Sequence, residues 1–323
     1  MKVFIADKFE KAGIDELERI GCEVDYRPGT SGKQLTEALN ESHSNMLIVR
    51  STKVPRETLE KAGALEVVIR AGSGCDNIDL TAATELGIRV CNCPGCNSVA
   101  VAELTIGLMI ALDRRIVDET EDLRHRIWNK KEYSKARGLK GRTLGIIGLG
   151  RIGEEVAKRA AAFDMNLLYT DVIARPDAET WYGIQKVPLD DLLRRSDFVT
   201  LHVTGGPQTR HLIGERELEL MQHGAFLINC SRGGVVDESA MAEAIESGRL
   251  AGAALDVYEV EPTSTESVFA DPIVGVPHVY GTHHVGASTE QAQSAIADEA
   301  VRVVQAFAVE GELLHCINPP MPA

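Results

Sequence analysis

Residues 144–171 limit the possible folds of this chain more than any other segment. The apolar run Leu144–Ile147 leads into the pattern G-x-G-x-x-G at residues 148–153, and a helical pattern, Glu154–Phe163, follows. In such a unit the first glycine makes a tight turn, the second admits a pyrophosphate, and the third lets the helix pack on the strand. The helix N-terminus then offers free N–H groups to the phosphates. The segment therefore predicts a dinucleotide-binding site.

An acidic residue completes this unit. Asp171 follows the predicted strand Asn166–Thr170. A carboxylate there accepts hydrogen bonds from the ribose diol and repels a 2′-phosphate, so the sequence favours NAD over NADP. Arg175 is close enough in sequence to keep NADP as an alternative.

Strand and helix patterns alternate along the whole chain, which predicts parallel sheets covered on both faces. The first set of predicted strands is Lys2–Ala6, Cys22–Tyr26, Met46–Val49, Val67–Ile69 and Ile88–Cys91. The second set is Thr143–Ile147, Asn166–Thr170, Phe198–Val203, Ala225–Asn229 and Ala253–Val257. A long helix over Glu290–Ala308 and a short strand over Leu313–Ile317 are expected to follow. The expected fold class is α/β, with two doubly wound parallel-sheet domains.

Composition narrows the possible partners. A chain of 323 residues suits two domains, and 44% hydrophobic with 25% charged residues is typical of globular proteins. The net charge of −14 argues against a nucleic-acid or anionic-membrane partner. No run is apolar enough to cross a bilayer, and charge interrupts the N-terminus early, so we expect a cytoplasmic protein.

Three further segments carry residues that can bind the carboxylate of a substrate or transfer a proton to it. Arg232 stands in a glycine turn after a strand, and its planar guanidinium can hold a carboxylate and polarise a carbonyl. Glu261 precedes a proline, and His284 lies between a strand end and a helix start. Histidine exchanges protons near neutrality, and a carboxylate can orient its ring. With the dinucleotide site, these residues predict hydride transfer between nicotinamide and a 2-hydroxy or 2-keto acid.

The chain resembles the D-2-hydroxyacid dehydrogenases over nearly its full length, and within them the D-3-phosphoglycerate dehydrogenases. The motifs that carry the resemblance are residues 49–52 (VRST), 70–79 (RAGSGCDNID), 94–98 (PGCNS), 102–103 (AE), 148–153, 230–234 (CSRGG), 253–257 (AALDV), 261–262 (EP) and 284–289 (HVGAST). The family fold implies a Rossmann NAD-binding domain over residues 98–287, inserted into a flavodoxin-like substrate-binding domain over residues 1–97 and 288–323.

The resemblance also implies roles for individual residues. His284 is expected to be the acid–base group, Glu261 its partner, and Arg232 the residue that binds the carboxylate and carbonyl of the substrate. The implied cofactor contacts are Gly148, Gly150, Arg151, Ile152, Gly153, Asp171, His202, Val203, Thr204, Thr209, Cys230, Ser231, Asp256 and Gly286. The implied substrate contacts are Arg50, Ser51, Arg70, Gly72, Ser73, Gly74 and Asn97, with Arg50 and Arg70 at the phosphate end. A homodimer is expected.

Several alternatives stay open. His278 rivals His284 as the catalytic histidine, although His284 fits the family motif better. Glyoxylate or hydroxypyruvate reduction is the nearest other activity, and a non-catalytic NAD-sensing scaffold of the corepressor kind is a more distant one. The pattern C-x-C-x-x-C is formed by Cys91, Cys93 and Cys96, and no fourth metal ligand lies nearby in the sequence. We therefore expect these cysteines to be free thiols and not to bind a metal ion. Oxidation of these thiols could affect the activity.

Overall fold

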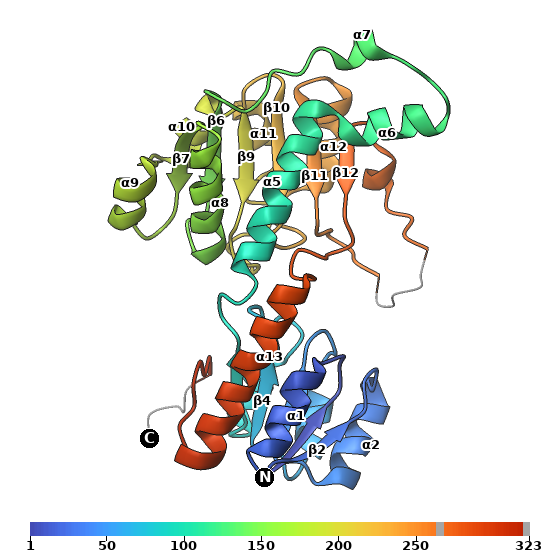
Figure 1. Ribbon diagram of the computed structural model, residues 1–323, viewed down its shortest axis with the longest axis vertical. Coiled ribbons are helices and arrows are strands. Elements are labelled where there is room, and N and C mark those ends of the chain that lie inside the picture. The colour runs from blue at the N-terminus through green and yellow to red at the C-terminus, as the bar shows by residue number, and fades with distance from the viewer. Residues whose placement is uncertain (263–267, 319–323) are drawn as a thin grey trace. The chain divides into compact units, whose positions relative to one another are not determined.

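The computed structural model describes residues 1–262 and 268–318 and divides into two units (Figure 1). Unit 1 comprises Met1–Asn97 and Ser288–Ala323, and unit 2 comprises Ser98–Ala287. Each unit contains one parallel sheet with helices on both faces, which confirms the predicted fold class. The separate roles of the two units in binding substrate and NAD stay predictions.

Unit 1 has a five-stranded sheet in the order β2-β1-β3-β4-β5, the flavodoxin-like arrangement. Its strands are β1 (Lys2–Ile5), β2 (Glu23–Tyr26), β3 (Met46–Val49), β4 (Val67–Arg70) and β5 (Arg89–Asn92). All four residues of β3 are buried, because helices cover both faces of this central strand. This burial explains why its sequence shows no alternation of polar and apolar residues.

Helices of unit 1 pack on the two faces of this sheet. They are α1 (Lys11–Arg19), α2 (Gly32–Ser42), α3 (Arg56–Lys61), α4 (Leu80–Glu85) and α13 (Glu290–Gln305). Leucines of α2 and α3 enter the core on one face, whereas α1 and α13 supply the core on the other. The side chains of Asp79 and Thr289 cap α4 and α13 by accepting backbone N–H groups.

Unit 2 has a seven-stranded sheet in the order β12-β11-β10-β9-β6-β7-β8, which contains the Rossmann order. Its strands are β6 (Thr143–Ile147), β7 (Asn166–Thr170), β8 (Gln185–Lys186), β9 (Phe198–Leu201), β10 (Ala225–Asn229), β11 (Leu250–Leu255) and β12 (Val279–Gly281). Its helices are α5 (Ser98–Arg114), α6 (Ile116–Arg124), α7 (Lys130–Tyr133), α8 (Arg151–Ala162), α9 (Pro176–Tyr182), α10 (Leu189–Arg195), α11 (Glu215–Leu220) and α12 (Glu238–Glu246). Figure 1 shows α5 and α8 on one face of the sheet and α11 and α12 on the other.

The sequence-based prediction of one element is wrong, and others shift slightly. The segment Leu313–Ile317 is not a strand, because Cys316 makes a single antiparallel bridge to Cys91 and the chain then turns. The last predicted helix ends as a π-helical turn, Ala306–Glu310. Among the described residues, no helix has the length and apolar character that crossing a bilayer requires.

Candidate active site

Three neighbouring strands of unit 2 position the side chains predicted to do the chemistry. Arg232 follows β10, Glu261 follows β11 and His284 follows β12. Strand β11 pairs in parallel with β10 on one side and with β12 on the other. The carboxyl ends of parallel strands meet at one edge of the sheet, which is where open α/β sheets bind ligands. The topology therefore brings these three residues, distant in sequence, to one edge.

Glu261 and His284 form a hydrogen-bonded pair. Glu261 Oε2 lies 2.8 Å from His284 Nδ1, and the two side chains are 36% and 50% exposed. Burial raises the pKa of the Glu261 carboxyl, but the hydrogen bond and charge of His284, together with the charge of Arg232, outweigh burial and leave the pKa below its ordinary value. Glu261 is therefore a carboxylate near neutral pH. Its bond to Nδ1 leaves Nε2 of His284 for proton exchange.

A buried acid holds the turn that carries this histidine. Asp256 is 2% exposed, and its carboxylate accepts the Val285 N–H at 2.8 Å, the Gly286 N–H at 2.9 Å and the Thr282 hydroxyl at 2.6 Å. His284 itself has a positive φ of 53°, a backbone conformation that costs free energy in a residue other than glycine. The three hydrogen bonds to Asp256 offset that cost and fix the position of the imidazole.

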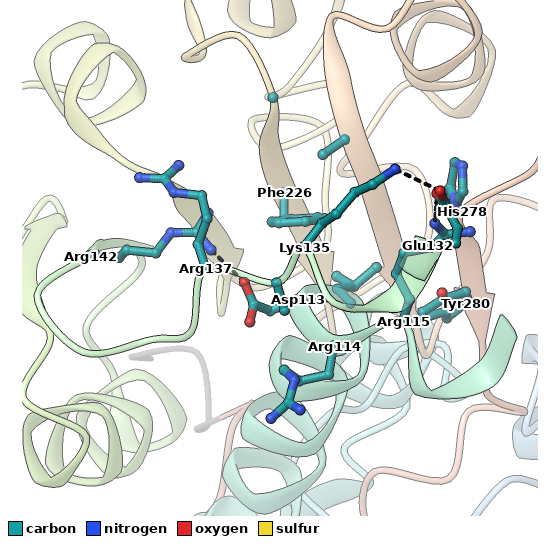
Figure 2. A pocket seen from close by; sticks show the side chains of 14 residues that line it. Asp113, Arg114, Arg115, Glu132, Lys135, Arg137, Arg142, Phe226, His278 and Tyr280 are labelled. Atoms are coloured by element: carbon teal, nitrogen blue, oxygen red, sulfur yellow. Dashed lines mark hydrogen bonds and ion pairs between the residues drawn. The ribbon is translucent and has the colours of Figure 1, made fainter. Parts of the chain in front are cut away.

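His278 lies at the opposite end of β12, directly before the strand. Its Nδ1 is 3.5 Å from Asp118 Oδ2 in α6. It lines a cavity of about 290 Å³ together with Tyr280, Arg115 and Glu132, whose side chains are labelled in Figure 2. The strand thus separates the two rival histidines, and Glu261 pairs with His284.

The glycine loop has the geometry that a pyrophosphate site requires. Gly148 has φ +90°, and a Cβ on Gly153 would lie 2.2 Å from the Gly148 carbonyl oxygen, so other residues would strain both positions. The carboxylate of Asp171 accepts the Leu149 N–H at 2.7 Å and the Ile173 N–H at 2.9 Å. It therefore lies beside the glycine turn. These residues fit a dinucleotide, with Gly150, Arg151 and Ile152 at the start of α8.

Further predicted cofactor contacts lie after β9 and β10. Burial lowers the pKa of His202 to about 3, so its ring is neutral. Its Nε2 is 3.0 Å from Thr200 Oγ1, whereas its buried Nδ1 lacks a hydrogen-bond partner among the described residues. An orphaned polar atom of this kind suits an edge that holds a polar ligand. Burial also raises the pKa of the Cys230 thiol to about 12, and the Ser231 hydroxyl donates to Asn229 Oδ1 at 2.7 Å.

Two of the remaining predicted residues, Thr209 and Arg232, make hydrogen bonds within unit 2. The Thr209 hydroxyl donates to the Thr204 carbonyl at 2.7 Å, which closes the turn after Val203. Arg232 Nη1 donates to the Ser231 carbonyl at 2.7 Å. These contacts order the loops at the same edge of the sheet as the glycine turn.

In unit 1, an acid that the sequence analysis missed organises the loop after β3. Asp7 Oδ2 accepts the N–H groups of Arg50, Ser51 and Thr52 at 2.6, 3.1 and 3.0 Å. Its Oδ1 accepts the hydroxyls of Ser51 and Thr52 at 3.3 and 3.0 Å. The guanidinium of Arg50 donates instead to Ser288 Oγ at 3.1 Å. Both donor groups of Ser51 are therefore directed to Asp7.

The predicted glycine turn of unit 1 packs on the segment after β5. Gly72 accepts the Cys93 N–H at 2.9 Å, and the Ser73 hydroxyl donates to Asn97 Oδ1 at 2.9 Å. Arg70 Nη1 lies 3.5 Å from the Ala71 carbonyl oxygen. The structure therefore brings Arg70, Gly72, Ser73 and Asn97 together, although they come from two segments.

The structure places a fourth cysteine, Cys316, beside Cys91, which the spacing of Cys91, Cys93 and Cys96 does not predict. Cys91 is fully buried and forms an antiparallel bridge with Cys316. Asn92 donates its N–H to His315 and Ile317 donates to Val90, so Cys91 and Cys316 are a non-hydrogen-bonded pair, and such pairs have Cα atoms about 4.5 Å apart. Burial and the neighbouring Cys316 thiol raise the pKa of the Cys91 thiol to about 12. In the described residues, no group of three or more His, Cys, Asp or Glu side chains is arranged to hold a metal ion.

Comparison with known proteins gives a consistent family. Residues 106–286 match the family model described as "D-isomer specific 2-hydroxyacid dehydrogenase, NAD binding domain". The chain is 43% identical to a D-3-phosphoglycerate dehydrogenase of Methanocaldococcus jannaschii, which covers 99% of this chain and 60% of that protein. It is 39% identical to a glyoxylate reductase of Thermococcus litoralis, covering 97% of this chain and 95% of the relative. The chain thus spans about three fifths of the length of the curated phosphoglycerate dehydrogenases it matches.

Solved structures agree with this result. A D-lactate dehydrogenase from Aquifex aeolicus, in complex with NAD and lactic acid, superposes with a TM-score of 0.86 at 29% identity, covering 99% of this chain and 100% of that one. A glyoxylate reductase from Paecilomyes thermophila gives 0.87 at 29% identity, with 98% of each chain covered. The resemblance found in the sequence is confirmed: the chain belongs to the D-isomer-specific 2-hydroxyacid dehydrogenases, a family with an NAD-binding domain.

Proposed function

We propose that the protein transfers a hydride between NAD and 3-phospho-D-glycerate, giving 3-phosphohydroxypyruvate. The observation that carries the chemistry is the Glu261–His284 pair at the strand edge that also carries Arg232 and the glycine loop. An acid–base group, a carboxylate that orients it and a guanidinium are what reduction of a 2-keto acid requires.

In the reductive direction the residues have distinct tasks. His284 donates a proton from Nε2 to the ketone oxygen, while Glu261 holds Nδ1 and stabilises the imidazolium. Arg232 binds the substrate carboxylate and polarises the carbonyl. The glycine loop and Asp171 would hold NADH, which would supply the hydride for the ketone carbon when bound. In the oxidative direction His284 takes the hydroxyl proton instead.

The position of Asp171 supports NAD rather than NADP. Asp171 is fixed beside the glycine turn by hydrogen bonds to two backbone N–H groups. A carboxylate held there cannot move away to admit a 2′-phosphate, and its free lone pairs suit the ribose diol. In unit 1, the residues proposed to contact the substrate are the Gly72–Gly74 turn and Asn97 for the carboxylate and Arg50 for the phosphate.

Glyoxylate or hydroxypyruvate reduction is the second candidate, because a glyoxylate reductase is among the similar proteins at 39% identity over 95% of its length. A non-catalytic NAD-sensing scaffold is a third and weaker one. A scaffold that does not catalyse a reaction does not require the hydrogen-bonded pair of Glu261 and His284.

A comparison of substrates tests these candidates. The kcat/KM for 3-phosphohydroxypyruvate and for hydroxypyruvate would be measured with NADH and then with NADPH. A preference of about a hundredfold for the phosphorylated acid, equal to about 2.7 kcal/mol, supports the proposal. A preference for hydroxypyruvate or glyoxylate favours the reductase, and absence of turnover with every keto acid favours the scaffold.

The proposal includes a homodimer in the cytoplasm. Apolar side chains of α6 and the turn after it are exposed: Ile116 by 45%, Val117 by 49%, Leu123 by 56%, Ile127 by 49% and Trp128 by 80%. A monomer rarely exposes such a group, so this surface is suited to a second copy. Light scattering after size-exclusion chromatography tests the assembly, with Trp128→Ser expected to shift it toward monomer.

A further inference from the structure

The loop that carries Glu261 is tied to a helix that plays no part in the proposed chemistry. This loop follows β11, and helix α12 begins at Glu238. Glu238 Oε1 accepts a hydrogen bond from the Glu259 N–H at 2.7 Å. Glu261 lies two residues further along the chain, where its Oε2 meets His284 Nδ1 at 2.8 Å. The start of α12 is therefore connected to the Glu261–His284 pair through the backbone of residues 259–261.

A second tie joins the same loop to the same helix end. The carboxylate of Glu259 forms a hydrogen bond with His211 Nε2. The other ring nitrogen of His211 lies 3.5 Å from Asp237 Oδ2, and Asp237 is the N-cap of α12. Both the backbone and the side chain of Glu259 are thus anchored at the start of α12. The turn over residues 259–261 therefore begins at a residue whose position is fixed.

We propose that Glu238 is a positioning residue of the active site, because its carboxylate holds the Glu259 N–H and thereby fixes the turn that presents Glu261 to His284. The inference rests on the roles proposed above for Glu261 and His284. It assigns no contact between Glu238 and the substrate.

The charge on Glu238 gives this role a dependence on pH. Burial raises the pKa of Glu238 to about 7, and the negative charges of Asp271, Glu259 and Glu261 act in the same direction against the stabilising Glu259 N–H. Asp271 caps the 3₁₀ turn Pro272–Gly275, which packs on α12. Above pH 7 the acceptor is a carboxylate, whose hydrogen bonds are roughly twice as strong as those of a neutral group. The hold on the loop therefore weakens as the pH falls through about 7.

Two variants separate the hydrogen bond from the charge. Glu238→Gln keeps an acceptor for the Glu259 N–H and removes the charge, whereas Glu238→Ala removes both. We would measure NADH-dependent reduction of 3-phosphohydroxypyruvate and of glyoxylate from about pH 5.5 to 9. The kcat ratio of wild type to Glu238→Gln should be near 1 at low pH and rise to about threefold above pH 8, with a midpoint near 7. Glu238→Ala should lower kcat by about tenfold, with the Kd for NADH unchanged.

Hydrogen exchange of the peptide that spans residues 256–261 gives a readout that needs no turnover. At pH 8 the Glu259 amide should exchange about tenfold faster in Glu238→Ala than in wild type, and about threefold faster in Glu238→Gln. Glu243→Ala, an exposed acid on the same helix, is the matched control and should change neither rate. Equal exchange in Glu238→Ala and wild type, or a kcat ratio independent of pH, overturns the inference. If wild type reduces neither acid, the proposed function fails, and the exchange rates still decide the role of Glu238.

Discussion

Replacing Arg50 by Met tests whether unit 1 selects a phosphorylated substrate. The backbone N–H groups of Arg50, Ser51 and Thr52 all donate to Asp7, at 2.6 to 3.1 Å, so none of them is available to an incoming anion. The loop is also fixed by these bonds and cannot move to make up for a lost side chain. Phosphate binding in this loop should therefore depend on the Arg50 guanidinium.

The magnitude follows from that arrangement. A hydrogen bond between charged groups contributes about 1.5–3 kcal/mol, which corresponds to a roughly 10- to 150-fold change in kcat/KM. Arg50 is partly exposed, so we expect the lower half of this range, about 10- to 40-fold, for 3-phosphohydroxypyruvate. Hydroxypyruvate lacks the phosphate and should change by less than about twofold.

The assay is NADH oxidation with both substrates, for wild type, Arg50→Met and Ser51→Ala. Ser51 is the matched control because its hydroxyl donates to Asp7 at 3.3 Å, and its loss should leave the substrate preference intact. An equal loss with both substrates in Arg50→Met would mean that Arg50 supports the fold or the carboxylate end. An unchanged preference would refute the assignment of the phosphate to this loop.

Three further predictions concern the catalytic histidine, the choice of cofactor and the Cys91–Cys316 pair. His284→Ala should lower kcat by at least about a hundredfold, whereas His278→Ala should stay within about threefold in the same assay, because a strand separates it from Glu261. Asp171→Asn should raise the NADPH-to-NADH ratio of kcat/KM by about tenfold, and no change would remove the ribose role from Asp171. Oxidised glutathione should convert the Cys91 and Cys316 thiols to a disulfide with formation of reduced glutathione, because their Cα spacing suits one. Peptide mapping without reductant detects it, and its absence in wild type would contradict the pairing.

The fold could be predicted because its signals are local. The buried strand β3 is a short, continuous apolar run, and the glycine pattern at residues 148–153 marks one strand–helix junction. The error at Leu313–Ile317 has a physical cause. Apolar residues there reach the core of unit 1, but the backbone makes one bridge at Cys316 and then turns. Apolar composition alone cannot distinguish a paired strand from a packed loop.

The candidate site was only partly predictable from sequence. Arg232, Glu261 and His284 could be named from their motifs, whereas their convergence depends on the order of β10, β11 and β12 in the sheet. Asp7 and Glu238 were missed because each acts through a backbone N–H far away in sequence. Acidic residues are common at strand ends and helix starts, so the residue type alone does not predict these contacts. A sheet order combined with the strand ends would have indicated Asp7.

Asp7 and Asp256 show how such a fold can hold a functional loop through its backbone N–H groups. Each follows a parallel strand, and each accepts consecutive backbone N–H groups from a loop after the neighbouring strand: residues 50–52 for Asp7 and residues 285–286 for Asp256. Loops at the carboxyl ends of parallel strands contain N–H groups that the sheet cannot satisfy, and a carboxylate one strand away can satisfy several of them. The side chains that meet the substrate in our proposal can then remain partly exposed, as His284 does at 50%. Variation at such a site can replace Arg50 for a new substrate while Asp7 keeps the loop over residues 50–52 in place.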